Sequence, residues 1–253
     1  MRRNILLIAW AAAMVLPFCA DAQHLKSDAE RAGFKNEVNM VHEVTRGSHG
    51  QVMGYPTIYY YNAVGNYSRV VYCDTTGKEQ VEVRYTYDSL GRLAKDGRYR
   101  IKGNELISEN TYERDRRART YTVQMSYAQD TMSDRLVYSY DKQGNVEKVS
   151  NYDENGRLLS RDFYQYDNHG MVREIVYTEG REENYRRTER FRYDSDGNVT
   201  ECRTLYITSE RQRLCYTYDF DNNGNWVRRS IFSVKGNAAE LVQTTVRDIV
   251  YFE

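Results

Sequence analysis

The residues with the clearest binding chemistry lie between positions 216 and 229. Trp226 stands where similar segments of this chain carry an aliphatic residue, Arg228 and Arg229 follow it, and Tyr216 and Tyr218 alternate just before it. Exposed aromatic rings of this kind form a stacking platform for sugar rings, because each ring combines an apolar face with a polar edge. We predict Trp226, Arg228, Tyr216 and Tyr218 as ligand-binding residues, with cross-strand packing of the tyrosines as the alternative.

The same region contains half of a calcium-binding pattern. Asp219, Asp221, Asn223 and Gly224 match the first half of the loop D-x-[DN]-x-[DN]-G, but the twelfth position is Ser230, where a bidentate Glu is expected. Asp, Asn and Gly are also the residues that a tight turn requires. A turn is therefore the favoured interpretation, and calcium is the alternative.

Three cysteines follow the first 22 residues. If a hairpin turns at Thr208 and Ser209, Cys202 and Cys215 face each other across it, and a disulfide between them is one of two expectations for an exported chain. Cys73 is then unpaired and is interpreted as a small buried apolar residue.

No other pattern indicates catalysis or a cofactor. His24, His42, His49 and His169 lack the spacing of metal ligands, and the chain has no nucleophile-elbow, zinc-protease, phosphate-loop or dinucleotide-binding motif. We predict a protein that is not an enzyme and holds no cofactor.

A repeated phrase must position these residues. The pattern Tyr-Asp-x-x-Gly, then a mostly polar and an aliphatic residue, begins at five positions and recurs in looser form at 61–67, 72–78 and 219–226. Asp favours the first position of a type I turn, and Gly adopts the left-handed conformation that closes a hairpin loop with a bulge. Each phrase therefore predicts strand, turn and strand. The five closest copies begin at Tyr87, Tyr140, Tyr152, Tyr166 and Tyr193.

The spacing of the phrases predicts the fold. Residues 81–87 and 214–218 alternate apolar with polar side chains, which is typical of half-buried strands, and a strand recurs every ~12–14 residues. We predict an all-β protein, an antiparallel meander of tandem hairpins with about sixteen strands in a curled or rolled sheet. Whether the sheet closes is left open.

The first 22 residues have the features of a secretory signal peptide. Arg2 and Arg3 precede an apolar run from residue 5 to 18, and Ala-Asp-Ala at 20–22 closes it, so cleavage is expected before Gln23. An N-terminal membrane anchor and a lipoprotein cut before Cys19 are the alternatives. Residues 23–54 lack the phrase and fit either a short helix or a first strand, and residues 55–253 form the predicted hairpin domain.

Charge and composition exclude several classes. The chain has 36 basic and 36 acidic residues, so it lacks the basic footprint of a nucleic-acid-binding protein. No segment after residue 22 approaches the ~20 apolar residues that a spanning helix needs. An outer-membrane barrel needs a continuous apolar outer face, whereas adjacent charges such as Arg161 and Asp162 place charge on both faces.

The phrase resembles the YD repeats of Rhs-type bacterial proteins, wall-associated proteins and teneurins, in which tandem hairpins spiral into a sheet-walled shell. The resemblance covers roughly residues 59–232. The chain is far shorter than a toxin-enclosing shell and lacks the core sequence that ends such shells. The resemblance implies the hairpin architecture and an extracytoplasmic setting, with carbohydrate binding as a further implication.

Together these features predict an exported protein in the periplasm, at the cell surface or secreted. Its expected role is a structural or interaction module of the envelope, with an unidentified protein or glycan as partner. Carbohydrate binding through exposed Tyr and Trp residues is the first alternative. An envelope hydrolase is the second.

Overall fold

The Tyr-Asp-x-x-Gly phrase folds into a tight turn with a bulge. The structure, a computed structural model, describes residues 27–128, 133–180, 185–206 and 211–253. In one phrase the Asp167 carboxylate accepts the N–H groups of His169 at 2.8 Å and Met171 at 2.9 Å, and Gly170 has a φ of 77°. The strand register shifts just before Tyr166, as a bulge requires.

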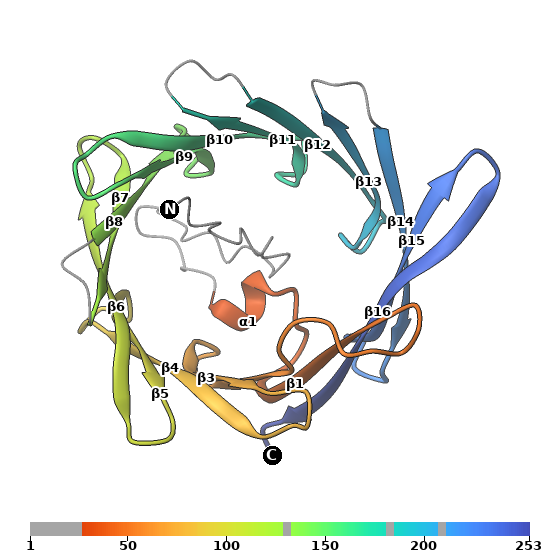
Figure 1. Ribbon diagram of the computed structural model, residues 1–253, viewed down its shortest axis with the longest axis horizontal. Coiled ribbons are helices and arrows are strands. Elements are labelled where there is room, and N and C mark those ends of the chain that lie inside the picture. Colours follow the sequence, from red (N-terminus) through yellow and green to blue (C-terminus); the bar gives the residue numbers. More distant parts are fainter. Residues whose placement is uncertain (1–26, 129–132, 181–184, 207–210) are drawn as a thin grey trace, which may run out of the picture.

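The strands pair in chain order and the last pairs with the first, so the sheet closes into a sixteen-stranded antiparallel barrel (Figure 1). The all-β antiparallel meander is confirmed, and the predicted curled or rolled sheet, whose closure the sequence left open, is a closed barrel. Closure satisfies the two edge strands that such a sheet would leave unpaired. The first eight strands are β1 (Val38–Gly47), β2 (Thr57–Tyr61), β3 (Tyr67–Cys73), β4 (Glu79–Tyr87), β5 (Leu93–Arg100), β6 (Glu105–Asp115), β7 (Thr120–Tyr127) and β8 (Ser133–Tyr140). The others are β9 (Val146–Tyr152), β10 (Leu158–Tyr166), β11 (Val172–Glu179), β12 (Tyr185–Tyr193), β13 (Val199–Tyr206), β14 (Arg211–Phe220), β15 (Trp226–Lys235) and β16 (Ala238–Tyr251).

The segment before the repeats contributes both a helix and a strand. The helix α1 (Asp28–Arg31) begins with the capping box of Ser27 and Glu30, and it lies within the ring of strands (Figure 1). The strand β1 pairs with β2 on one side and β16 on the other, so it completes the barrel. The described part of residues 23–54 thus belongs to the same barrel as the hairpins. Among the described residues, no helix is long and apolar enough to cross a membrane.

Many of the charged side chains on the outward face form ion pairs. Lys95 and Glu109 approach to 2.5 Å, and Glu201, whose side chain is 8% exposed, holds Arg213 at 2.5 Å and Arg203 at 2.7 Å. A barrel whose wall faces lipid instead turns a continuous apolar band outward. These ion pairs place charge on the outer wall of the described strands.

Tyrosine hydroxyl groups connect neighbouring hairpins along one rim. The Tyr193 hydroxyl donates to the carbonyl of Val172 at 2.7 Å, and the Tyr166 hydroxyl donates to the carbonyl of Val146 at 2.8 Å. Each acceptor is the aliphatic residue that ends the preceding phrase on the same rim, so the bond ties one hairpin to the next. Because consecutive strands alternate in direction, every second turn lies on this rim, which we call the YD rim. Its turns include residues 62–66, 88–92, 141–145, 167–171, 194–198 and 221–225.

The first prediction concerns the turn glycine. Gly170→Val places a β-branched residue at a φ of 77°, and we expect unfolding by urea to show a loss of about 1–3 kcal/mol. No atom lies within 4 Å of a Cβ built on Gly170, so the loss comes from the backbone alone. The exposed neighbour His169→Ala is the control. An unchanged urea midpoint for Gly170→Val would contradict the turn geometry.

The second prediction concerns the hydroxyl groups on the YD rim. Tyr193→Phe keeps the ring but removes the bond to Val172, and we expect a loss of about 0.5–1.5 kcal/mol in the free energy of unfolding. Tyr55→Phe, at an exposed position, should leave stability unchanged. Equal stability of both variants would show that the hydroxyl bond does not hold the hairpins together.

Candidate chamber inside the barrel

Nine tyrosines of the strands turn into the barrel, where they line a cavity of about 640 Å³ that we call the chamber. Since side chains alternate across a strand, the inward Tyr positions oppose one another from strand to strand. Aliphatic side chains such as Val70 and Leu136 fill the wall between the rings. The lining tyrosines are Tyr59, Tyr61, Tyr67, Tyr72, Tyr85, Tyr87, Tyr112, Tyr121 and Tyr138.

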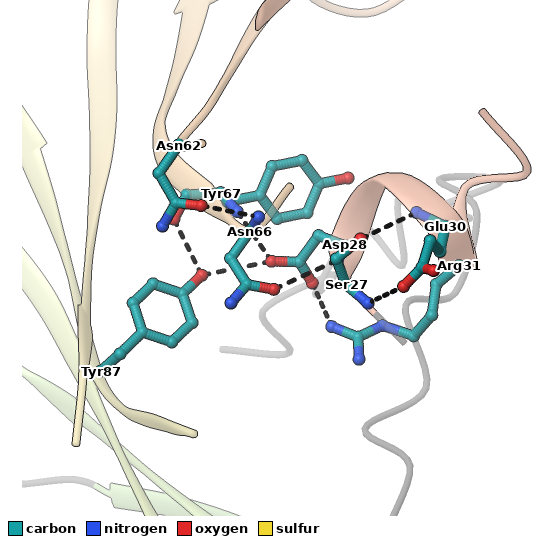
Figure 2. A network of polar contacts seen from close by, with 8 residues as sticks. All are labelled: Ser27, Asp28, Glu30, Arg31, Asn62, Asn66, Tyr67 and Tyr87. Carbon is teal, nitrogen blue, oxygen red and sulfur yellow. Dashed lines mark hydrogen bonds and ion pairs between the residues drawn. The ribbon is translucent and has the colours of Figure 1, made fainter. Parts of the chain in front are cut away.

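The helix α1 forms part of the chamber wall. Its first residue, Asp28, holds it through the polar contacts shown in Figure 2. The buried Asp28 carboxylate accepts the backbone N–H of Tyr67 at 2.8 Å, lies 3.2 Å from the Tyr87 hydroxyl and pairs with Arg31. The next residue donates its N–H to the carbonyl of Gly65 at 2.9 Å, where a Cβ would lie 2.7 Å from the Ser27 hydroxyl oxygen. Glycine at position 65 therefore lets α1 dock on the YD rim.

Three of the lining tyrosines keep their hydroxyl groups available. Among the described residues, none forms a hydrogen bond with the hydroxyl of Tyr59, Tyr85 or Tyr138. By contrast, the Tyr112 hydroxyl donates to Asp96. Burial raises the pKa of Tyr59 and Tyr85 and takes that of Tyr138 to about 12, so all three stay protonated at neutral pH. The chamber wall thus offers three hydroxyl donors to a ligand.

Arg247 lines the chamber at the seam between β1 and β16. The Arg247 Nε donates to Glu43 at 2.8 Å, and its guanidinium lies 3.4 Å from the centre of the Trp226 ring and 5.0 Å from that of Phe34. Trp226 therefore packs against the seam arginine. This contact explains why Trp226 replaces the usual aliphatic residue of the phrase.

The predicted ligand-binding residues are divided between the two faces of the wall. Tyr218 lies 6.1 Å from Trp226, ring centre to ring centre, and Tyr216 faces the interior beside it. Arg228 instead points outward, 3.5 Å from Asp219, and its side chain is 59% exposed. The bulge after Trp226 adds one residue and reverses the alternation, so Arg229 is the arginine that lines the chamber. Allowing for the one extra residue of the predicted bulge in the inward–outward alternation would have selected Arg229 as the inward arginine.

The Asp221 carboxylate, a candidate calcium ligand, already accepts hydrogen bonds within the protein. The Asp221 carboxylate accepts the N–H groups of Asn223 and Asn225, both at 2.9 Å, and the Tyr251 hydroxyl. These bonds hold the pKa of Asp221 below its usual value against the effect of its partial burial. Asp219 lies on the outer wall, on the opposite side of the strand from the turn contacts. The hydrogen bonds of the turn therefore account for the calcium-like pattern at residues 219–224.

The histidines are dispersed in the structure. His42 lies 3.7 Å from Asp248, and His49 and His169 are exposed in turns. His24 lies outside the described residues. Within residues 27–253 as described, no three His, Cys, Asp or Glu side chains gather closely enough to hold a metal ion.

The predicted disulfide between Cys202 and Cys215 is wrong, because the register of β13 against β14 differs by one residue from the one assumed. The structure pairs Cys202 with Leu214 and Glu201 with Cys215, so the two cysteines lie on opposite faces of the sheet and both are free. A shift of one residue reverses every side chain of a strand. The proposed turn at 208–209 lies outside the described residues. Cys73 is buried and free, in line with its interpretation as a small apolar residue.

A second polar cluster lies on the inner wall of β10, β11 and β12. The Tyr177 hydroxyl donates to Glu189 at 3.1 Å, and the Arg187 guanidinium lies 4.0 Å from the centre of the Tyr177 ring. Asp162 faces Tyr177 across the ladder. Burial raises the pKa of Asp162 to about 6, with Arg187 opposing the shift and Glu189 adding to it. Asp162 therefore exchanges a proton close to neutral pH.

Comparison with known proteins places the fold among solved barrels. No family model matches the chain, and no curated protein matches it in sequence. A porin-like protein from Bacteroides uniformis is 12% identical, with 86% of this chain and 99% of that chain covered and a TM-score of 0.57. This similarity shows a shared barrel fold and nothing about activity. The chain is thus a closed, sixteen-stranded antiparallel barrel with a tyrosine-lined chamber.

Two further solved structures align with TM-scores below one half. A porin-like protein from Bacteroides vulgatus is 12% identical over 85% of this chain and 98% of its own, with a TM-score of 0.28. The Photorhabdus luminescens Tc holotoxin pore is 13% identical over 75% of this chain and 12% of its own, also with a TM-score of 0.28.

The third prediction follows from Asp162. Its pKa of about 6 in the folded protein exceeds the ordinary value of 3.8, so its protonated form favours folding at low pH and this stability is lost as pH rises through 6. The substitution Asp162→Asn removes this pH-dependent loss of stability. Relative to the wild type, we expect the variant to gain stability in urea unfolding as pH rises from about 4 to about 7, and the difference to stay constant above that.

The exposed Asp219→Asn is the matched control for Asp162→Asn and should follow the wild type across this pH range. A constant difference between Asp162→Asn and the wild type would contradict the buried position of Asp162.

Proposed function

We propose that the chain is an exported, non-enzymatic interaction module of the cell envelope that binds a carbohydrate in its chamber. The observation that carries this proposal is the inner wall of nine tyrosines, three with hydroxyl groups that no described residue engages. A chamber of about 640 Å³ lies in the size range of sites for small ligands. The Trp226 site expected on an outer surface is thereby replaced by an interior one.

Carbohydrate matches this wall for a chemical reason. Each sugar ring has an apolar face of C–H groups and a rim of hydroxyl groups. A tyrosine ring packs against the former, and its hydroxyl bonds to the latter. Tyr59, Tyr85 and Tyr138 supply donors from three different strands, so a ligand can be held from several sides.

Binding without turnover is inferred from the carboxylates. Glycosidases use a pair of carboxyl groups on either side of the scissile bond. Among the described residues, the chamber is lined by only two, and both are engaged: Asp28 pairs with Arg31 and Glu43 with Arg247. Asp162 lies outside this lining. This arrangement favours a binding module over the envelope hydrolase.

The setting of the module is inferred from the sequence. The leader-like residues 1–22 support export, and we infer that the hairpins are divergent YD repeats because the Tyr-Asp-x-x-Gly phrase recurs along the YD rim. The charged outer wall suits a position in an aqueous compartment of the envelope, or at the surface.

A protein partner on the outer wall is the second candidate. The strand β16 presents exposed apolar side chains along its outward face, and isolated exposed apolar residues become informative when they form a row. This row would suit an interaction module whose partner is a protein. Its residues are Leu241, Val242, Val246 and Val250.

The fourth prediction tests the chamber. The mature protein is screened on a glycan array, and the affinity for its best ligands is measured by calorimetry. Tyr85→Phe and Tyr138→Phe should each weaken binding roughly two- to tenfold, because each removes one hydrogen bond without changing the ring.

Tyr55→Phe, an exposed position, is the control and should bind as the wild type does. Absence of glycan binding, or binding abolished by Val246→Asp but unaffected by the two chamber variants, would overturn the proposal. The latter result would move the function to the outer row on β16.

A further inference from the structure

We propose that the chamber selects acidic sugars, and that Arg229 binds the carboxylate of a uronic acid unit. This inference rests on the proposed function and adds the charge of the ligand to it. Its starting point is the balance of charge on the chamber wall, which favours an anion.

Positive charge is in excess around the chamber. Within the described residues, five arginines and two carboxylates line it, an excess of three positive charges. Two of the arginines are neutralised by the lining carboxylates, and a third by Asp88 at 2.5 Å. Arg114 and Arg229 remain without a carboxylate partner. The arginines are Arg31, Arg92, Arg114, Arg229 and Arg247, and the carboxylates are Asp28 and Glu43.

Arg229 is placed to receive an anion. It faces Tyr218 in the ladder, and its guanidinium lies 5.0 Å from the centre of the Trp226 ring. Its Nε is buried and has no hydrogen-bond partner. The neighbouring Arg247 lies against the same ring but is satisfied by Glu43. Of the two guanidinium groups on Trp226, only that of Arg229 therefore lacks a carboxylate partner among the described residues.

A carboxylate is the group that best fits this arrangement. A buried N–H group without an acceptor, such as the Arg229 Nε, is costly, and a carboxylate accepts two parallel N–H bonds from a guanidinium. A cationic ligand would meet repulsion, and a neutral sugar would leave the charge uncompensated. Arg114, whose guanidinium lies 5.2 Å from the centre of the Tyr121 ring, adds a second positive group on another strand. A short oligosaccharide with uronic acid units combines sugar rings with the required negative charge.

The test uses matched pairs of ligands. Oligosaccharides of galacturonic, glucuronic and mannuronic acid are compared with their carboxyl-reduced forms, which keep the linkages and the rings but lack the charge. We expect the wild type to bind at least one acidic form roughly tenfold or more tightly than its reduced form. The preference should shrink as salt concentration rises.

The variants use two adjacent arginines of β15. Arg229→Gln should abolish the preference for the acidic form while retaining binding of the reduced form, which also shows that the variant is folded. Arg228→Gln removes the same charge from the outer wall and should keep the preference. Equal affinity for both forms in the wild type, or a preference that survives Arg229→Gln, would overturn the inference and leave carbohydrate binding standing. Failure to bind either form of every pair, together with a blank glycan array, would overturn both.

Discussion

The pairing of β1 with β16 is the constraint on which the rest of the structure depends. It joins residues about 200 positions apart, and without it a meander of sixteen strands would expose two edges and no interior. The buried Thr245 shares a hydrogen bond of 2.9 Å with Thr45, and Arg247 bonds to Glu43 beside it. These polar pairs set the register of the seam, because a slip of one residue would separate both.

Closure gives the two faces of the sheet different surroundings. Inside, tyrosine rings of neighbouring strands pack against one another, and polar groups buried among them interact more strongly than those on the outer wall. Outside, arginine and glutamate pairs remain near solvent and contribute less to stability. The same alternation therefore produces both a polar exterior and a chamber with few but influential polar groups.

Local structure was predictable from the sequence, and the global arrangement was not. The turn residues and the spacing of the phrase predicted hairpins, bulges and about sixteen strands, because each of these depends on a few neighbouring residues. Closure depends on the pairing of β1 with β16, whose residues lie about 200 positions apart in the sequence, and no local pattern reveals it. The short helix and the first strand were alternatives for residues 23–54, and the structure contains both.

The errors at the candidate site have one cause. The choice of Arg228 over Arg229 and the pairing of Cys202 with Cys215 each depended on the strand register. In both cases the register assumed from the sequence was wrong by one residue. The bulge after Trp226 reverses the faces in the first case, and the pairing of β13 with β14 differs by one residue in the second. Tyr59, Tyr85 and Tyr138 were not selected as site residues, because the chamber becomes visible only when the barrel is closed.

The inward orientation of the tyrosines is tested most directly by nitration of the native protein with tetranitromethane, followed by peptide mass spectrometry. We expect rapid nitration of Tyr55 and Tyr127, which are 61% and 42% exposed, and slow nitration of Tyr121 and Tyr140, which are 1% and 4% exposed. Nitration of Tyr121 and Tyr140 at the rate of Tyr55 would contradict a closed barrel with its tyrosines inside.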